Sequence, residues 1–245
     1  MMRNVVVTGG SRGIGLAIAK KLAAAGFCAI AVARKKTDQL DAAIAEAAQG
    51  GENVIRFAPF DLRDVDKIQT FVAGLRKSCG PIYGLVNNAA LGTEGSLSLM
   101  PNARIAELVH LNTLSPMVFT KYVVRAMMAD GGGRIVNVAS IVAFTGYSGL
   151  SVYSATKASM LGFTRSLARE VGRMGVNVNA VAPGFIETEM TDGMTDEQRA
   201  RVARRSALHR LPAVEDVGDA VMFLMGDGAR SVTGTVLTID AGSTA

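Results

Sequence analysis

The sequence predicts an α/β fold, with one doubly wound parallel sheet of about seven strands and helices on both of its faces. Short apolar runs typical of strands alternate with longer segments of helical pattern, and this alternation favours a parallel sheet. The runs lie near Val5, Ala29, Val54, Leu85, Ile135, Val176 and Val236. At 245 residues, 49% of them hydrophobic, the chain can bury such a sheet within one domain spanning residues 1–245. We find no linker, internal repeat or low-complexity segment.

The first strand, residues 5–8, leads through a glycine-rich turn into a helix. Gly9, Gly13 and Gly15 give the spacing G-x-x-x-G-x-G, with Gly10 as an additional glycine. Glycine lets the backbone turn tightly and approach a pyrophosphate, whose charge then meets the amides at the start of the helix. The spacing is not G-x-G-x-x-G, so that fingerprint does not apply. Two interpretations stay open, a dinucleotide site and a purely structural tight turn.

The end of the second strand, residues 28–33, indicates which dinucleotide would bind. An NAD site is expected to have an acidic residue about 20 residues after the glycines, which holds the ribose 2′-hydroxyl. Here Arg34, Lys35 and Lys36 follow the strand instead. Arg34, with Arg12 in the glycine turn, would pair with a 2′-phosphate, for which the forked guanidinium is well shaped. The pattern predicts NADP(H), with a solvated basic loop as the alternative.

Ser140, Tyr153 and Lys157 form the most informative pattern. Ser140 ends an apolar strand at residues 134–140, and ligands of open parallel sheets bind at the carboxyl ends of strands. Tyr153 and Lys157 stand four residues apart on the next helix, so their side chains share one face. The Lys157 ammonium would stabilise the Tyr153 phenolate and lower the phenol pKa from its usual value of about 10. The alternative is a half-buried packing tyrosine beside a solvated lysine.

These groups suit the reduction of a carbonyl by hydride transfer from a nicotinamide. Negative charge builds on the carbonyl oxygen during the transfer, so the site needs donors aimed at that oxygen and a proton to give it. Ser140 would orient the oxygen, and Tyr153 would protonate it. No metal is expected, because neither a C-x-x-C pair nor a histidine cluster accompanies Cys28 and Cys79.

Together, these motifs resemble the short-chain dehydrogenase/reductase family over essentially the whole chain. Its cofactor motifs T-G-x-x-x-G-x-G, N-N-A-G and P-G are matched by residues 8–15, residues 87–89, and Pro183 and Gly184 with Thr188. Its catalytic tetrad is matched by Asn112, Ser140, Tyr153 and Lys157. Within the family, the chain is most similar to the bacterial 3-oxoacyl-acyl-carrier-protein reductases, through residues 11–15, 153–157, 166–171 and 181–190.

The resemblance implies a Rossmann-type fold, NADP(H) as the cofactor and a homotetramer. Lys157 would also hold the nicotinamide ribose, and Asn112 would kink its helix and help a chain of water molecules to resupply the proton. From the residues alone, Asn112 is equally well explained as a side chain that binds neighbouring backbone, and Asp61 as a helix or turn cap. The expected cofactor contacts are Gly9, Ser11, Arg12, Gly13, Ile14, Gly15, Arg34, Asp61, Leu62, Asn88, Ala89, Tyr153, Lys157, Pro183, Gly184, Ile186 and Thr188.

The implied substrate is a 3-oxoacyl thioester, attached to acyl carrier protein or to coenzyme A. Phe144 and Tyr147 would line its pocket, and residues 186–206, which include Met190 and Met194, would form a mobile lid. Two alternatives stay open. One is the same chemistry on a sugar, polyol, steroid or other secondary alcohol, and the other is a non-catalytic NADP(H)-binding protein. The intact tetrad speaks against the second.

Two departures from the family pattern concern the cofactor and the partner. Ala90 stands where the N-N-A-G motif has its last glycine, which adds a methyl group near the cofactor. Residues 126–133 contain no cation, although carrier-protein reductases often have a basic surface there. The row Arg165, Arg169 and Arg173 would present another basic surface, unless it is only a solvated helix face.

Charge and cysteine content bound the remaining functions. The net charge is +5, but the cations are dispersed, so we expect no nucleic-acid partner. No apolar run reaches the ~20 residues of a membrane span, and the early first strand leaves no room for a signal peptide. Two free thiols suit a reducing compartment, so we expect a soluble cytoplasmic protein. The apolar edge strand at residues 233–240 favours an oligomer.

Overall fold

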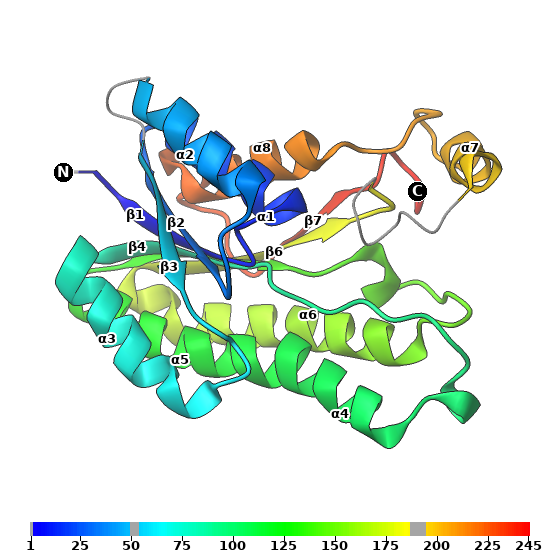
Figure 1. Cartoon of the computed structure of the whole chain (residues 1–245), viewed down its shortest axis with the longest axis horizontal. Helices are drawn as coiled ribbons and strands as arrows, with labels where there is room; N and C mark the ends of the chain where they lie inside the picture. The colour runs from blue at the N-terminus through cyan, green and yellow to red at the C-terminus, as the bar shows by residue number, and fades with distance from the viewer. Residues whose placement is uncertain (1, 50–53, 187–194) are drawn as a thin grey trace.

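The computed structural model describes residues 2–49, 54–186 and 195–245. Within these ranges, seven strands form one parallel sheet in the order β3-β2-β1-β4-β5-β6-β7 (Figure 1). This arrangement confirms the predicted fold class. The strands are β1 (Asn4–Thr8), β2 (Cys28–Ala33), β3 (Val54–Pro59), β4 (Ile82–Asn87), β5 (Gly133–Val138), β6 (Val176–Pro183) and β7 (Val236–Ile239).

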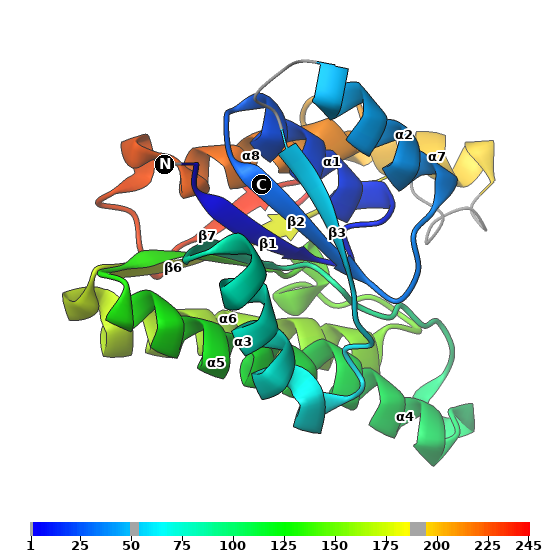
Figure 2. The same ribbon diagram turned by 60° about the vertical axis from the view of Figure 1, so that its left-hand side comes forward.

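Helices cover both faces of the sheet, as Figure 1 and Figure 2 show. The helices on one face are α1 (Gly13–Ala24), α2 (Asp38–Gln49) and α8 (Val214–Met225). Those on the other face are α3 (Ile68–Cys79), α5 (Ser115–Ala129) and α6 (Ser151–Val171). The short helix α4 (Asn102–Val109) leads into α5, and α7 (Asp196–Arg205) lies beyond the carboxyl end of β6.

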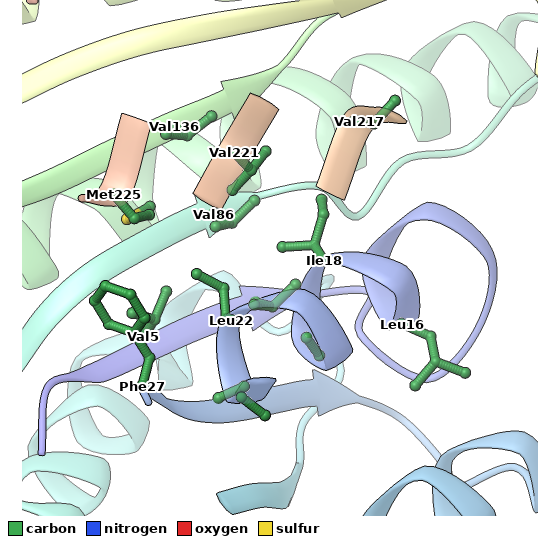
Figure 3. Close-up of a cluster of buried hydrophobic side chains, with 14 of the residues drawn as sticks. Val5, Leu16, Ile18, Leu22, Phe27, Val86, Val136, Val217, Val221 and Met225 are labelled. Atoms are coloured by element: carbon green, nitrogen blue, oxygen red, sulfur yellow. The ribbon is translucent and has the colours of Figure 1, made fainter. Parts of the chain in front are cut away.

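The core between the sheet and α1 joins segments from the two ends of the chain. Strand β1 is buried along its whole length, as expected of a central strand that has helices on both faces. Ile18 and Leu22 of α1 lie close to Val221 and Met225 of α8 in the same apolar cluster (Figure 3). Each such fully buried aliphatic side chain stabilises the fold by roughly 1.5–3 kcal/mol.

The strand order places the point at which the sheet reverses its direction of winding at β1 and β4. Strand β1 lies between β2 and β4, and the connections that leave β1 and β4 run to opposite faces. Ligands of open α/β sheets bind outside the carboxyl ends of the strands at such a point of reversal. The turn after β1 and the segment after β4 therefore frame the expected cofactor site.

Two strands are shorter than the sequence predicts. Strand β5 ends at Val138 rather than at Ser140, because Ser140 caps a short 3-10 turn, η4 (Ile141–Ala143). Strand β7 begins at Val236 rather than at residue 233, because Gly234, with φ +74°, adopts a left-handed conformation that breaks the extended chain. The order places β7 at an edge of the sheet, as predicted.

Candidate active site

Tyr153 and Lys157 lie in the first two turns of α6. The ammonium Nζ of Lys157 is 5.7 Å from the centre of the Tyr153 ring and donates a 2.8 Å hydrogen bond to the carbonyl oxygen of Val138. Lys157 is 5% exposed, whereas Tyr153 is partly buried. Because Val138 is the last residue of β5, this hydrogen bond holds the lysine at the carboxyl edge of the sheet.

The predicted direction of the Tyr153 pKa is wrong for this structure. Burial raises the pKa of Tyr153 to about 12 and lowers the pKa of Lys157 to about 8. The lysine donates to Val138 rather than to the phenol, so the loss of hydration dominates the pKa of the tyrosine. At neutral pH the phenol therefore keeps its proton, which suits a proton donor.

The buried lysine is expected to make stability depend on pH. Between its folded pKa of about 8 and its ordinary value of 10.5, the unfolded chain keeps a proton that the folded chain has released, so rising pH favours folding. Relative to Lys157→Met, the free energy of unfolding of the wild type should rise by about 2 kcal/mol between pH 8 and pH 10. Urea unfolding at several pH values measures this, with Lys77→Met on exposed surface as the control. If the difference in unfolding free energy between wild type and Lys157→Met does not change with pH, the pKa of Lys157 is not lowered.

Ser140 presents a weakly held hydroxyl group at the same edge. Its Oγ accepts a hydrogen bond from the amide of Val142 at 3.4 Å. The hydroxyl donates to the carbonyl oxygen of Pro183 at 3.5 Å. Both distances are long for hydrogen bonds, so neither partner holds the hydroxyl firmly. The hydroxyl proton can therefore turn towards a substrate oxygen at small cost.

Asn112 lies in a π-helical turn, η3 (His110–Leu114), between α4 and α5, which matches the expected break in the helix. Its side chain is 3% exposed and makes three hydrogen bonds. Two join its amide group to the backbone N–H and C=O of Leu91 at 2.8 and 2.9 Å, and the third reaches Thr156 Oγ1 at 3.2 Å. The structure thus shows the backbone-binding alternative, and it links the segment after β4 to α6.

The glycine turn is packed tightly against the end of β4. The side chain of Asn88 donates to the carbonyl oxygens of Thr8 and Gly9, and Thr8 Oγ1 accepts from the amides of Asn88 and Ala89. A Cβ atom on Gly15 would lie 2.2 Å from the carbonyl oxygen of Gly9, so only glycine fits there. Gly9 and Gly13 both have positive φ. Ile14 packs against the core from the start of α1.

The additional glycine has a packing explanation. A Cβ atom on Gly10 would lie 2.9 Å from the Cα and Cβ atoms of Ala31 in the neighbouring strand β2. The turn therefore passes directly over β2. Gly10 serves this close approach.

The basic loop after β2 is joined to the glycine turn by Thr37, a residue that the sequence analysis missed. Thr37 Oγ1 donates to the carbonyl oxygen of Ser11 and accepts from the amide of Leu40 near the start of α2. A threonine directly before a helical pattern is an N-cap signal that could have revealed it. Lys36 forms an ion pair with Asp41, whereas exposed Arg34 forms no ion pair with another described residue.

Asp61 and Leu62 follow β3 beside this loop. The carboxylate of Asp61 accepts from the side chain of Arg63 at 2.7 Å and from its amide at 3.0 Å, which is the turn geometry of the capping alternative. The Arg63 hydrogen bonds, with a smaller contribution from nearby Arg34, lower the pKa of Asp61. Leu62 packs into the core, and its carbonyl oxygen accepts from Ser115 Oγ.

The end of β6 approaches the serine from the other side. Pro183 offers its carbonyl oxygen to Ser140, and a Cβ atom on Gly184 would lie 2.8 Å from Asp240. Ile186 is 5% exposed within the core. Thr188, Met190 and Met194 lie outside the described residues, as does most of the first half of the predicted lid.

Two aromatic side chains lie close to this end of β6. The ring centres of Tyr147 and Phe185 are 5.5 Å apart. Phe144 and Tyr147 are both about half exposed, so apolar surface is available at the mouth of the site.

The comparison with known families gives a clear result. The family model described as short chain dehydrogenase matches residues 3–199. The chain belongs to this family. It is an oxidoreductase.

Individual members of the short chain dehydrogenase family agree over nearly the whole length. The chain is 39% identical to 3-oxoacyl-acyl-carrier-protein reductase FabG of Vibrio harveyi, over 97% of this chain and 95% of that protein. It is 36% identical to the reductase of the same name from Haemophilus influenzae, over 97% and 96%. A crystal structure of a gluconate 5-dehydrogenase from Burkholderia cenocepacia, in complex with NADP and tartrate, superposes with a TM-score of 0.92 at 26% identity, covering 99% of this chain and 95% of that one.

The two departures from the family pattern can now be placed. Ala90 lies between the residues held by Thr8 and by Asn112, in a partly buried segment. Residues 126–133 run from the end of α5 into β5, where Asp130 pairs with Arg76 at 2.7 Å. Arg165 and Arg169 are exposed on α6, 12 and 16 residues beyond Tyr153, which places them about 18 and 24 Å along the helix axis. This position fits the solvated-face alternative rather than a surface at the mouth of the site.

No helix among the described residues is long and apolar enough to cross a membrane. No group of three or more His, Cys, Asp or Glu side chains in the same residues is arranged to hold a metal ion. Cys28 is buried in β2, and burial raises the pKa of its thiol.

Proposed function

We propose that this chain is an NADPH-dependent reductase that converts a 3-oxoacyl thioester to its 3-hydroxyacyl form. The observation that carries the proposal is the position of Tyr153 beside buried Lys157, at the sheet edge that also holds Ser140 and the glycine turn. The Vibrio and Haemophilus relatives are both named 3-oxoacyl-acyl-carrier-protein reductase, which supports a thioester as the substrate.

The residues at the sheet edge fit NADP(H). The glycine turn leads directly into the amides at the start of α1, where a pyrophosphate would be stabilised. Exposed Arg34, next to the turn through Thr37 and Ser11, would pair with the 2′-phosphate, and Arg12 would assist it. Pro183 and Gly184 would flank the nicotinamide. When bound, the nicotinamide supplies the hydride.

The protein groups supply the proton and the orientation. Ser140 donates a hydrogen bond to the substrate carbonyl oxygen, and Tyr153 gives that oxygen its hydroxyl proton as negative charge develops. Lys157, with a pKa of about 8, is mainly charged at neutral pH, and its field stabilises the tyrosinate that remains. Asn112 acts as a positioning residue, because it holds Leu91 and Thr156 rather than a substrate.

A substrate screen tests the proposal. We expect the fastest turnover with 3-oxoacyl thioesters and NADPH, in a panel that also holds sugar acids, polyols and other secondary alcohols with both nicotinamide cofactors. A sugar acid is the second candidate, because the Burkholderia structure is a gluconate 5-dehydrogenase. Faster turnover of gluconate than of any thioester would decide for that candidate, and no turnover at all would leave only cofactor binding.

The proposed domain is one NADP(H)-binding unit over residues 1–245, with a lid at 186–206. Directly after this lid, the segment that follows α7 is joined to residues 241 and 242 by two backbone hydrogen bonds. Ala207 donates to Gly242 at 3.3 Å and Leu208 to Ala241 at 3.0 Å. We place the protein in the cytoplasm on the basis of its two free thiols.

Purified protein is expected to be a symmetric oligomer, most simply a homotetramer. Edge strand β7 leaves Leu237 38% exposed, neighbouring α8 leaves Phe223 47% exposed, and the α4–α5 junction leaves Val109 and Leu114 more than 40% exposed. Burying these two apolar areas against copies of themselves would cover the sheet edge. Light scattering measures the mass, and a monomer throughout the micromolar range would refute the expectation.

A further inference from the structure

Four polar side chains form a row of hydrogen bonds in the apolar core between the sheet and helices α5 and α6. Asn87 and Asn137 are paired residues of the neighbouring strands β4 and β5, and the Asn87 amide donates to the side-chain oxygen of Asn137 at 2.8 Å. At one end of the row, Asn87 also donates to Thr120 Oγ1 of α5 at 2.8 Å. At the other end, Asn137 donates to Thr164 Oγ1 of α6 at 2.8 Å. None of the four residues is more than 5% exposed. We call this row the amide ladder.

The amide ladder fixes the position of α6 more closely than apolar packing does. Leu167 and Ala168 of α6 lie in one apolar cluster with Phe119 and Val123 of α5. Apolar contacts have no preferred direction, whereas a hydrogen bond needs a short distance and good alignment. If α6 moved along its axis by the rise of one residue, about 1.5 Å, an N–H of Asn137 would be buried without its partner. The ladder therefore selects one position of α6 against the sheet.

The hydrogen bond between Asn137 and Thr164 lies next to the one that holds Lys157. Val138 follows Asn137 in β5, and its carbonyl oxygen accepts from Lys157 Nζ at 2.8 Å. Thr164 comes seven residues after Lys157, about two helical turns, so both side chains lie on one face of α6. Successive residues of β5 thus hold this helix face at two points.

The two hydroxyl groups that are proposed to meet the substrate oxygen belong to the elements that these hydrogen bonds join. Ser140 follows the end of β5, and Tyr153 lies in the first turn of α6. Their separation therefore depends on where α6 lies relative to β5. Lys157 is itself a reacting group and would change its contacts when the nicotinamide ribose binds. Thr164 takes no part in the chemistry, so its hydrogen bond can hold α6 in place throughout the reaction.

We propose that Thr164, held by Asn137, is a positioning residue of this enzyme. It sets the position of α6 along its axis and, with it, the distance between the hydroxyl groups of Tyr153 and Ser140. The inference rests on the roles of these two hydroxyls in the proposed function. Thr164 and Asn137 are both 0% exposed, so neither side chain touches substrate or cofactor. Loss of the hydrogen bond should therefore slow the chemical step without weakening binding.

Thr164→Val tests the inference, because valine keeps the shape of the side chain and removes the hydroxyl. With NADPH and the substrate that the screen ranks first, we expect kcat to fall by about tenfold to a hundredfold, since a misplacement of about 1 Å can cost that much. KM and the NADPH dissociation constant should stay close to their wild-type values. The solvent deuterium isotope effect on kcat should rise, because proton transfer from a displaced Tyr153 becomes slower. Thr164→Ser keeps the hydroxyl and should retain most of the wild-type kcat.

Thr120→Val is the matched control. It removes a similarly buried hydroxyl from the opposite end of the ladder, on α5, which carries neither Ser140 nor Tyr153. Urea unfolding should show a similar loss of stability in both valine variants, whereas kcat should fall only in Thr164→Val. An equal fall of kcat in both variants would overturn the inference, as would a wild-type kcat in Thr164→Val.

A second variant covers the case in which Thr164→Val does not fold. Asn137→Leu/Thr164→Val replaces both partners by apolar groups, so neither end of their hydrogen bond is left unpaired. The same fall in kcat is expected, and a wild-type kcat in this variant would contradict the inference. Tyr153→Phe tests the proposed function separately. If Tyr153→Phe is defective while Thr164→Val is normal, only the role of Thr164 fails, whereas normal turnover in Tyr153→Phe refutes the proposed proton donor itself.

Discussion

Tyr153→Phe is expected to reduce turnover by about 10²–10⁴-fold, while NADPH binds almost as well as to the wild type. The change removes the hydroxyl proton that the carbonyl oxygen receives and keeps the ring that packs beside Lys157. The phenol carries its proton at neutral pH, so the variant removes the group that is proposed to donate it. Steady-state kinetics with NADPH and a 3-oxoacyl thioester, together with a cofactor titration, measure both effects.

Tyr122→Phe provides the matched control, because Tyr122 is a partly buried tyrosine on α5, away from the carboxyl edge. This variant should turn over at close to the wild-type rate. Near-normal turnover in Tyr153→Phe would show that another group, or water, gives the proton. It would remove Tyr153 from its assigned role.

Arg34→Asp is expected to weaken NADPH binding by about tenfold to a hundredfold. A hydrogen bond to a charged group contributes roughly 1.5–3 kcal/mol, and the new carboxylate also repels the 2′-phosphate. It would stand close to Asp61, whose pKa Arg34 now helps to lower, so repulsion in the loop increases. NADH lacks the phosphate, and its 2′-hydroxyl can donate to the new carboxylate. Its affinity should hold or improve.

Titration by nicotinamide fluorescence measures both cofactors. Lys35→Asp makes the same change of charge one residue further along the exposed loop, so it separates a specific contact from a general loss of positive charge. If wild type binds NADH as tightly as NADPH, or if both variants change the ratio equally, the loop is only solvated surface. The preference for NADP(H) would then be wrong.

The sheet could be predicted from the sequence because its strands carry their own signals. Strand β2, which is buried on both faces, is a continuous apolar run, and the predicted residues 28–33 match it in full. The glycine turn was equally visible, since its spacing reflects contacts as close as that of Gly15 with Gly9. The ends of strands were harder to predict. The apolar run continues to Ser140, but the strand ends at Val138 because Ser140 caps the turn that follows.

The interactions within the site depend on distant segments and could not be inferred. Asn112 binds Leu91, 21 residues earlier, and nothing local to either residue indicates the pair. The pKa of Tyr153 depends on how much of the phenol the folded chain buries. The i, i+4 spacing to Lys157 indicated only that a positive charge lies near the phenol.

The packing of α1 against α8 has a consequence for how the chain is made. Ile18 and Leu22 are synthesised some two hundred residues before Val221 and Met225, which cover them. Until then, the nascent chain exposes the apolar face of α1 that α8 later covers. The same order delays the active site, because Ala139 donates to Val181 and so needs β6. Contacts between segments that are distant in the sequence form slowly, and the intermediates that precede them are prone to aggregation. Synthesis therefore includes a long interval in which this apolar face is uncovered, and the catalytic edge forms only after β6 has been made.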